Sequence, residues 1–244
     1  MRSEDARHAL TDRFTVNPPR AIAATFCLVL SHLCPPATLA QGATVAGRIT
    51  ILEREGVRTD DLADAVVYLE PRGGARSSTR ATTQIVMESR RFIPQVRVIP
   101  VGGAVQFPNS DPFRHNVFSK SGPSEFDLGL YGRGQSRAAE VKRAGIYPIF
   151  CNIHSTMVAY IVGVSTPYYT QPGSDGTYRL ESVPPGTYTL RIWHERGGAQ
   201  TREVDVAANG VTGVDVQLDA RGHRFVQHRN KFGQEYSPAG RDRY

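Results

Sequence analysis

The sequence predicts an all-β protein built from β-sandwiches, and three observations support that class. Short alternating or apolar runs of about four to eight residues dominate the chain after residue 40, as expected for strands. Turn residues separate these runs, for example Gly102-Gly103 and Pro185-Gly186. No stretch after residue 40 keeps a helical period. The clearest expected strands are 45–51, 65–69, 96–99, 104–107 and 187–193.

The first 40 residues predict a secretory signal peptide. Four arginines between residues 2 and 20 precede an apolar stretch over 21–33, and small residues precede Gln41. The apolar stretch is about 13 residues long, whereas a membrane-spanning helix needs about 20. We therefore expect cleavage near Ala40, no membrane span, and a periplasmic or secreted protein. An uncleaved anchor and a lipid anchor at Cys34 remain alternatives.

The segment 144–157 carries a candidate metal site. Cys151, His154 and Met157 are spaced Cys-x2-His-x2-Met directly after an apolar run, and His115 lies upstream at the end of another expected strand. A thiolate, two imidazoles and a weak thioether are the ligands of a blue copper electron-transfer site. The sulfurs stabilise Cu(I) and the imidazoles accept Cu(II). The sequence therefore predicts one type 1 copper ion per chain on these four residues.

Zinc, haem and a purely structural role are the alternatives to copper for this cluster. Half of a zinc site is less consistent, because zinc sites do not use thioethers, and a c-type haem would need Cys-x-x-Cys-His. Met157 as a core residue and His154 as an ordinary loop histidine remain open. The number of cysteines favours a metal-binding role for Cys151 over a purely structural one. Loss of residues 1–40 removes Cys27 and Cys34, so that Cys151 becomes a lone thiol that ligation would protect in an oxidising compartment.

The same residues resemble the cupredoxin family, with loop spacing closest to amicyanin. Gly145, Tyr147 and Cys151 match its Gly-x-Tyr-x-x-x-Cys segment, and 107–111 followed by His115-Asn116 resembles its aromatic-x-Asn-x-Asp, then His-Asn, signature. The resemblance implies a Greek-key sandwich over 80–164 with His115 as the N-terminal ligand. It also implies that Asn116 hydrogen-bonds the Cys151 sulfur and ties the two ligand loops together.

Two segments fit this pattern less well. Pro148 lacks the N–H that a strand before Cys151 would use, which predicts an edge position or a bulge. Residues 123–136 are ambiguous, and we expect a loop there rather than a helix.

A second domain is indicated by residues 173–180 and 183–190. They read Gly-Ser-Asp-Gly-Thr-Tyr-Arg-Leu and Val-Pro-Pro-Gly-Thr-Tyr-Thr-Leu, which resembles the carboxypeptidase regulatory-like, transthyretin-like domain. The first half of that family's pattern appears earlier, before the copper segment. We therefore expect 42–71 and 165–218 to form one transthyretin-like, Ig-like sandwich with 80–164 inserted. The alternative is two consecutive domains, with 42–71 extending the copper sandwich.

The predicted function is transfer of single electrons between exported redox partners, such as a c-type cytochrome or a dehydrogenase. The whole arrangement resembles exported proteins labelled methylamine-utilisation or plastocyanin-like proteins. An apolar patch for partners could include Pro112, Phe113, Tyr131 and Pro148. The alternative is copper storage or delivery, or an envelope binding module without redox turnover.

An enzyme is not expected, because multicopper enzymes need further histidine-rich centres. The remaining histidines are interpreted as a strand-end residue, His194, and two solvated tail residues, His223 and His228. Residues 219–244 form a basic, extended tail. The formal net charge of +6 is not arranged in a basic stripe with aromatic residues, so nucleic acid is not an expected partner.

Overall fold

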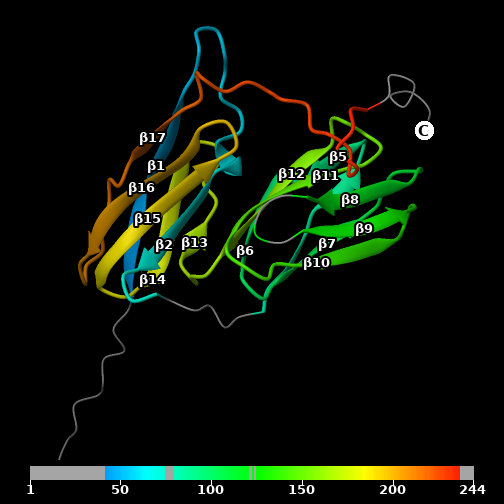
Figure 1. Ribbon diagram of the computed structural model, residues 1–244. Helices are drawn as coiled ribbons and strands as arrows, with labels where there is room; N and C mark the ends of the chain where they lie inside the picture. Colours follow the sequence, from blue (N-terminus) through cyan, green and yellow to red (C-terminus); the bar gives the residue numbers. More distant parts are fainter. Residues whose placement is uncertain (1–41, 75–79, 121–122, 124, 237–244) are drawn as a thin grey trace, which may run out of the picture. The chain divides into compact units, whose positions relative to one another are not determined.

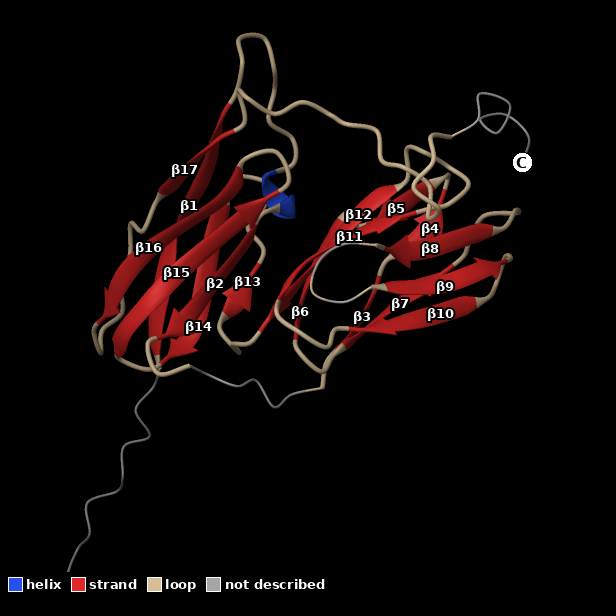
Figure 2. Cartoon of the chain, viewed as in Figure 1, coloured by secondary structure: helices blue, strands red, loops and turns tan. Residues whose placement is uncertain are grey.

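The computed structural model describes residues 42–74, 80–120, 123 and 125–236, and the predicted signal peptide lies outside them. Apart from one short 3-10 helix, Leu62–Asp64, the regular secondary structure of the described residues consists of strands joined by turns and loops (Figure 2). This confirms the predicted all-β class. Within the described part, no helix is long and apolar enough to cross a bilayer.

One pair of sheets combines strands from before and after the predicted copper segment (Figure 1). One sheet has the order β14-β1-β17 and the other the order β13-β2-β15-β16. The strands are β1 (Ala43–Leu52), β2 (Val66–Pro71), β13 (Tyr169–Thr170), β14 (Thr177–Val183), β15 (Gly186–His194), β16 (Gly198–Val206) and β17 (Val216–Asp219). Pairing of β1 with β14 is antiparallel, and pairing with β17 is parallel.

Alternation of apolar and polar residues explains this sandwich. Along β15, Tyr188, Leu190 and Ile192 are buried while the residues between them are more exposed. They share one core with Tyr178 and Leu180 of β14, and each buried side chain of this size contributes about 1.5–3 kcal/mol.

Two glycines of this sandwich are required by close packing. A Cβ on Gly47 would meet the backbone carbonyl of Val214. Gly176 has a φ of 82° and lies against the carbonyl of Ile49. A larger residue at either position would push β1 away from its neighbours.

The strands between β2 and β13 form a separate set of sheets with their own core. A five-stranded sheet has the order β6-β12-β11-β8-β9, a three-stranded sheet the order β10-β7-β3, and β4 and β5 form a hairpin. The strands are β3 (Thr82–Gln84), β4 (Val86–Glu88), β5 (Arg91–Ile93), β6 (Val96–Pro100), β7 (Ala104–Pro108), β8 (His115–Ser119), β9 (Phe126–Tyr131), β10 (Ser136–Glu140), β11 (Gly145–Phe150) and β12 (Val158–Val164). Phe107, Tyr147, Ile149 and Met157 are fully or almost fully buried there, together with Cys151.

The expectation of a loop over 123–136 is wrong for its central part. Residues 126–131 form β9, which pairs antiparallel with β8. Phe126 and Leu128 pack against the core, an alternation that Asp127 and Gly129 within the strand obscure in the sequence.

Pro148 lies in β11, between β12 and β8 in the sheet order, and not on an edge strand. The ladder to β12 includes Pro148, opposite Tyr160. The register with β8 consists of a single pair, Phe150 with Phe118. The missing N–H of Pro148 therefore falls where β11 is paired on one side only.

Candidate metal centre

Two neighbouring strands position the three strongest candidate ligands. His115 is the first residue of β8, and Cys151 directly follows the last residue of β11. A tight turn then carries His154 and Met157 back toward β12. The Met157 N–H donates to the His154 carbonyl at 3.1 Å, and the Cys151 N–H donates to the Met157 carbonyl at 3.3 Å. This turn places His154 beside the Cys151 sulfur.

The donor atoms form a compact triangle. Cys151 Sγ lies 3.8 Å from His115 Nδ1 and 3.6 Å from His154 Nδ1, and the two Nδ1 atoms are 3.1 Å apart. A circle through three points with these separations has a radius of about 2.0 Å, and bonds from zinc to nitrogen or sulfur are about 2.0–2.3 Å. The triangle therefore has the size of a first-row metal site.

Burial decides the protonation of these groups. Cys151 and His115 are fully buried and His154 is 8% exposed. Burial raises the pKa of the Cys151 thiol, although backbone N–H groups, including that of Asn116, oppose the change. Burial and the charges of His115 and Arg90 lower the pKa of His154 to about 4. The Nδ1 atoms of His115 and His154 are thus available as lone-pair donors at neutral pH. A metal ion must displace the proton of the Cys151 thiol in order to bind.

Asp111 fixes the orientation of His115. Its Oδ2 atom lies 2.7 Å from His115 Nε2. The Asp111 carboxylate also accepts two backbone hydrogen bonds, from Ser89 to Oδ1 at 2.7 Å and from Arg90 to Oδ2 at 3.0 Å. Burial acts to raise the pKa of Asp111, but the bonds from Arg90 and His115 outweigh it and the pKa is lowered. The ionised carboxylate therefore keeps the proton on Nε2 and leaves the Nδ1 lone pair facing the sulfur.

The role of Asp111 is not among the predicted ones, although the residue lies inside the 107–111 signature. The spacing of four residues to His115 was the available signal. Because the two residues lie in a turn and at the start of a strand, that spacing predicts contact only once the turn geometry is known.

Asn116 contacts the Cys151 sulfur through its backbone, as the resemblance implies, whereas its side chain has another partner. Its side-chain nitrogen donates to Asp127 Oδ1 at 2.7 Å, and its Oδ1 is buried without a hydrogen-bond partner among the described residues. The backbone N–H of Asn116 is the group that acts on the Cys151 thiol, lowering its pKa. The side chain therefore ties the His115 loop to β9, and the backbone faces the sulfur.

The aromatic ring of Phe113 contacts both candidate ligand histidines. The Phe113 ring lies edge-on to His115 at 5.2 Å between centroids and 5.6 Å from the His154 ring. The Arg90 guanidinium lies over the same Phe113 ring. Tyr131, expected in a surface patch, is instead buried, and its hydroxyl donates to the Phe107 carbonyl at 2.8 Å.

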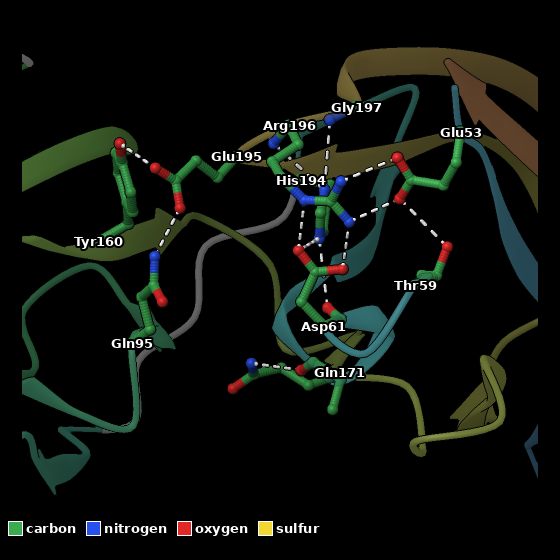
Figure 3. Close-up of polar contacts among 11 residues, drawn as sticks. Glu53, Thr59, Asp61, Gln95, Tyr160, Gln171, His194, Glu195, Arg196 and Gly197 are labelled. Carbon is green, nitrogen blue, oxygen red and sulfur yellow. Dashed lines mark hydrogen bonds and ion pairs between the residues drawn. The ribbon is translucent and has the colours of Figure 1, made fainter. Parts of the chain in front are cut away.

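His194 belongs to a structural network far along the chain from these ligands (Figure 3). Its Nδ1 accepts backbone N–H bonds from Arg196 and Gly197, so that Nε2 carries the proton and donates to the Asp61 carbonyl at 3.2 Å. The Arg196 guanidinium binds both carboxylate oxygens of Asp61 at 2.6 Å and also contacts Glu53. All nitrogens of His194 are satisfied, which supports its interpretation as a structural strand-end residue.

The interpretation of His228 as a solvated tail residue is wrong. Its ring stacks on Phe150, the residue before Cys151, with centroids 4.3 Å apart. The sequence offered no pattern that would place the tail at this position.

Comparisons with known proteins give one domain match. Residues 158–219 match the carboxypeptidase regulatory-like domain. That segment begins in β12 and covers β13 to β17. No curated protein matches the chain.

Solved structures with local likeness include a cupredoxin, an amicyanin and a Cu-containing nitrite reductase. A purple cupredoxin from Nitrosopumilus maritimus is 21% identical, with a TM-score of 0.31, over 34% of this chain and 99% of its own. Amicyanin from Paracoccus versutus is 20% identical, with a TM-score of 0.32, over 39% of this chain and 91% of its own. A Cu-containing nitrite reductase from Thermus scotoductus is 22% identical, with a TM-score of 0.34, over 48% of this chain and 28% of its own.

TM-scores below 0.5 do not transfer a function from these proteins, so the site rests on its own geometry. Its donors are two neutral imidazoles and one thiol, all buried and in mutual reach. The chain thus contains a carboxypeptidase regulatory-like domain, and its His115, Cys151 and His154 cluster fits a blue copper site.

Proposed function

We propose that the chain is a type 1 copper protein that carries single electrons between exported redox partners. The observation that carries the proposal is the buried triangle of Cys151 Sγ and two histidine Nδ1 atoms, about the size of one metal ion. One thiolate and two imidazoles in a trigonal arrangement are the ligands that suit copper in both oxidation states. One ion per chain would occupy the site.

The residues would have distinct roles in holding copper. Cys151, His115 and His154 would be the strong ligands. Met157 is fully buried at the end of the same turn and would be the weak axial ligand. Asp111 would hold the His115 ring in place, and Asn116 would stabilise the His115 loop through Asp127. Copper bound there supplies a reversible one-electron couple.

Burial favours electron transfer over copper delivery. A delivery protein must release its ion, whereas these ligands lie in a packed core and are held by backbone bonds of the turn. His154, at 8% exposure, is the one ligand of the triangle that reaches the surface at all. Electrons would enter and leave there, with a c-type cytochrome or a dehydrogenase as the partner. Copper storage, copper delivery and envelope binding without redox turnover are the alternatives that the test must exclude.

Two broader assignments belong to the same proposal. The protein would act in the periplasm or outside the cell after cleavage near Ala40. Residues 80–164 would be a copper domain inserted into a sandwich made from 42–71 and 165–218, an arrangement supported by the pairing of β1 and β2 with later strands.

Copper loading of the purified protein tests the site. We expect an intense visible thiolate-to-copper band that Cys151→Ser abolishes and His115→Ala disrupts. His223→Ala, which changes a tail histidine, is the control and should keep the band. A colourless protein that prefers zinc would refute the copper assignment.

Stopped-flow mixing with periplasmic cytochromes at several ionic strengths tests the function. We expect rapid, reversible oxidation and reduction without loss of copper. Because the net charge is positive, the rate with an acidic partner should fall as salt is added. Copper that dissociates on reduction, with no rapid electron exchange, would favour delivery instead.

A further inference from the structure

The C-terminal segment 228–236, named here the C-terminal strap, lies against the cysteine turn although it is part of no sheet (Figure 1, orange to red). It comes after β17, the last strand of the other sandwich, and thus far in sequence from β8 and β11. Three separate contacts join it to the candidate metal centre.

The first contact completes a link between the two ligand loops. Asp127 accepts a hydrogen bond from Asn116, next to His115, and its other oxygen is 2.7 Å from Lys231 Nζ. The backbone N–H of Lys231 donates in turn to Asn152 Oδ1 at 2.9 Å. An additional connection between the His115 loop and the Cys151 turn therefore runs through Asp127 and the strap.

The second contact reaches the ligand residue itself. The Tyr236 hydroxyl donates to the backbone carbonyl of Cys151 at 2.6 Å. A short, partly buried bond of this kind restrains the peptide that follows the sulfur-bearing residue. The same hydroxyl lies 3.2 Å from His228 Nδ1, which fixes its direction.

The third contact is aromatic. The His228 ring stacks on Phe150, with an interplanar angle of 23°, and lies edge-on to the Tyr236 ring. Phe150 also contacts Phe118 of β8, and the two residues form the single pair of the β8–β11 register. The strap therefore covers the point where the two ligand-bearing strands meet.

We propose that Lys231 and Tyr236 are positioning residues of the metal centre, and that the strap holds the two ligand loops together and keeps the Cys151 turn closed. The part of this proposal that is tested with bound copper rests on the proposed function. Closure of the Cys151 turn by the strap does not depend on copper. The strap acts without touching the metal donors, through the carbonyl of Cys151, the side chain of Asn152 and the carboxylate of Asp127.

Thiol reactivity in the metal-free full chain tests closure directly. Cys27→Ser and Cys34→Ser leave Cys151 as the one thiol, and its rate of reaction with an aromatic disulfide reports how often the turn opens. Tyr236→Phe removes only the hydroxyl, and we expect reaction about tenfold faster, the factor for loss of one hydrogen bond. Lys231→Met, which removes the contact with Asp127, should also make the Cys151 thiol react faster.

Matched controls remove similar groups elsewhere. Tyr188→Phe loses a hydroxyl that also donates to a backbone carbonyl, that of Pro184, in the other sandwich. Arg72→Met loses an exposed ion pair with Glu203 in the other sandwich. Both controls should react at the parent rate. Strap variants within twofold of the controls would overturn the proposal, even if they bind copper normally.

The reduction potential of the copper-loaded protein gives a second readout that a merely structural role would not move. A hydrogen bond to the Cys151 carbonyl withdraws electron density from the ligand, so Tyr236→Phe should stabilise Cu(II) and lower the potential. An unchanged potential would refute the effect of Tyr236 on the copper site, and an unchanged thiol rate would by itself refute closure of the turn by the strap. Faster thiol reaction in a parent protein that never turns blue would support the strap and refute the copper function.

Discussion

At the residue scale, Asp111 controls how His115 presents its lone pair. Asp111→Asn would remove the charge and place an amide N–H₂ group or a weaker acceptor opposite Nε2. Loss of such a partner typically lowers metal affinity about 10- to 100-fold. We expect a loss of that size in a competitive copper titration at constant pH. Asp175→Asn, on an exposed turn, serves as the control, and equal affinity in the two variants would contradict the role of Asp111.

Single residues also mark the limit of sequence reasoning. Residue type and spacing predict His115, Cys151 and His154 as candidate ligands. Each lies at or near the end of an expected strand, so pairing of these strands is enough to bring the three side chains together. Asp111 and Tyr236 could not be predicted in the same way. Their roles depend on one turn and on a tail path that no periodicity encodes.

At the element scale, the ends of β1 and β15 are joined by Arg196, which lies between Glu53 and Asp61 (Figure 3). Arg196→Met would leave two partly buried carboxylates without their cation, at a cost of about 2 kcal/mol of unfolding free energy. Fluorescence of Trp193, the one tryptophan of the chain, during urea unfolding at pH 7 would report it. Arg179→Met, in the exposed pair with Glu181, should change little.

The same network predicts an acid dependence. The hydrogen bond from Arg196 lowers the pKa of Glu53, and for Asp61 burial acts to raise the pKa but Arg196 and His194 outweigh it. Carboxylates with lowered pKa values stabilise the fold above their unfolded values of about 4, and the stability is lost as the pH falls through the folded values. The difference between the parent and Arg196→Met should therefore shrink below about pH 4. A constant difference down to about pH 3 would contradict this account.

Strand positions show which elements sequence patterns can predict. Strands with clear alternation or strong turn boundaries, such as β1, β7 and β15, appear within a few residues of the expected ranges. β9 was missed because it contains Asp127 and Gly129, residue types that are depleted in strands. Pairing partners cannot be inferred from alternation alone, since it specifies a face and not a neighbour.

At the scale of the whole molecule, the strands that flank the candidate copper segment lie side by side. The Leu69 N–H donates to the Tyr168 carbonyl at 2.9 Å, and β2 pairs with β13. Replacing 75–167 by a short Gly-rich linker would therefore close a short gap. We expect a soluble β domain that unfolds cooperatively in urea, as followed by circular dichroism. If instead only a fragment of 42–164 folds by itself, the two domains are consecutive.

The pairing of β1 with β14 and β17 has a consequence for how the chain matures. A polypeptide that emerges N-terminus first holds all of β3 to β12 before β14 exists. β1 and β2 must then wait as unpaired, partly apolar strands, the state in which aggregation and chaperone capture are most common. Tyr236, which contacts the cysteine turn, emerges after all of these strands. A product that stops before Tyr236 would thus contain every candidate metal ligand and still lack part of their support.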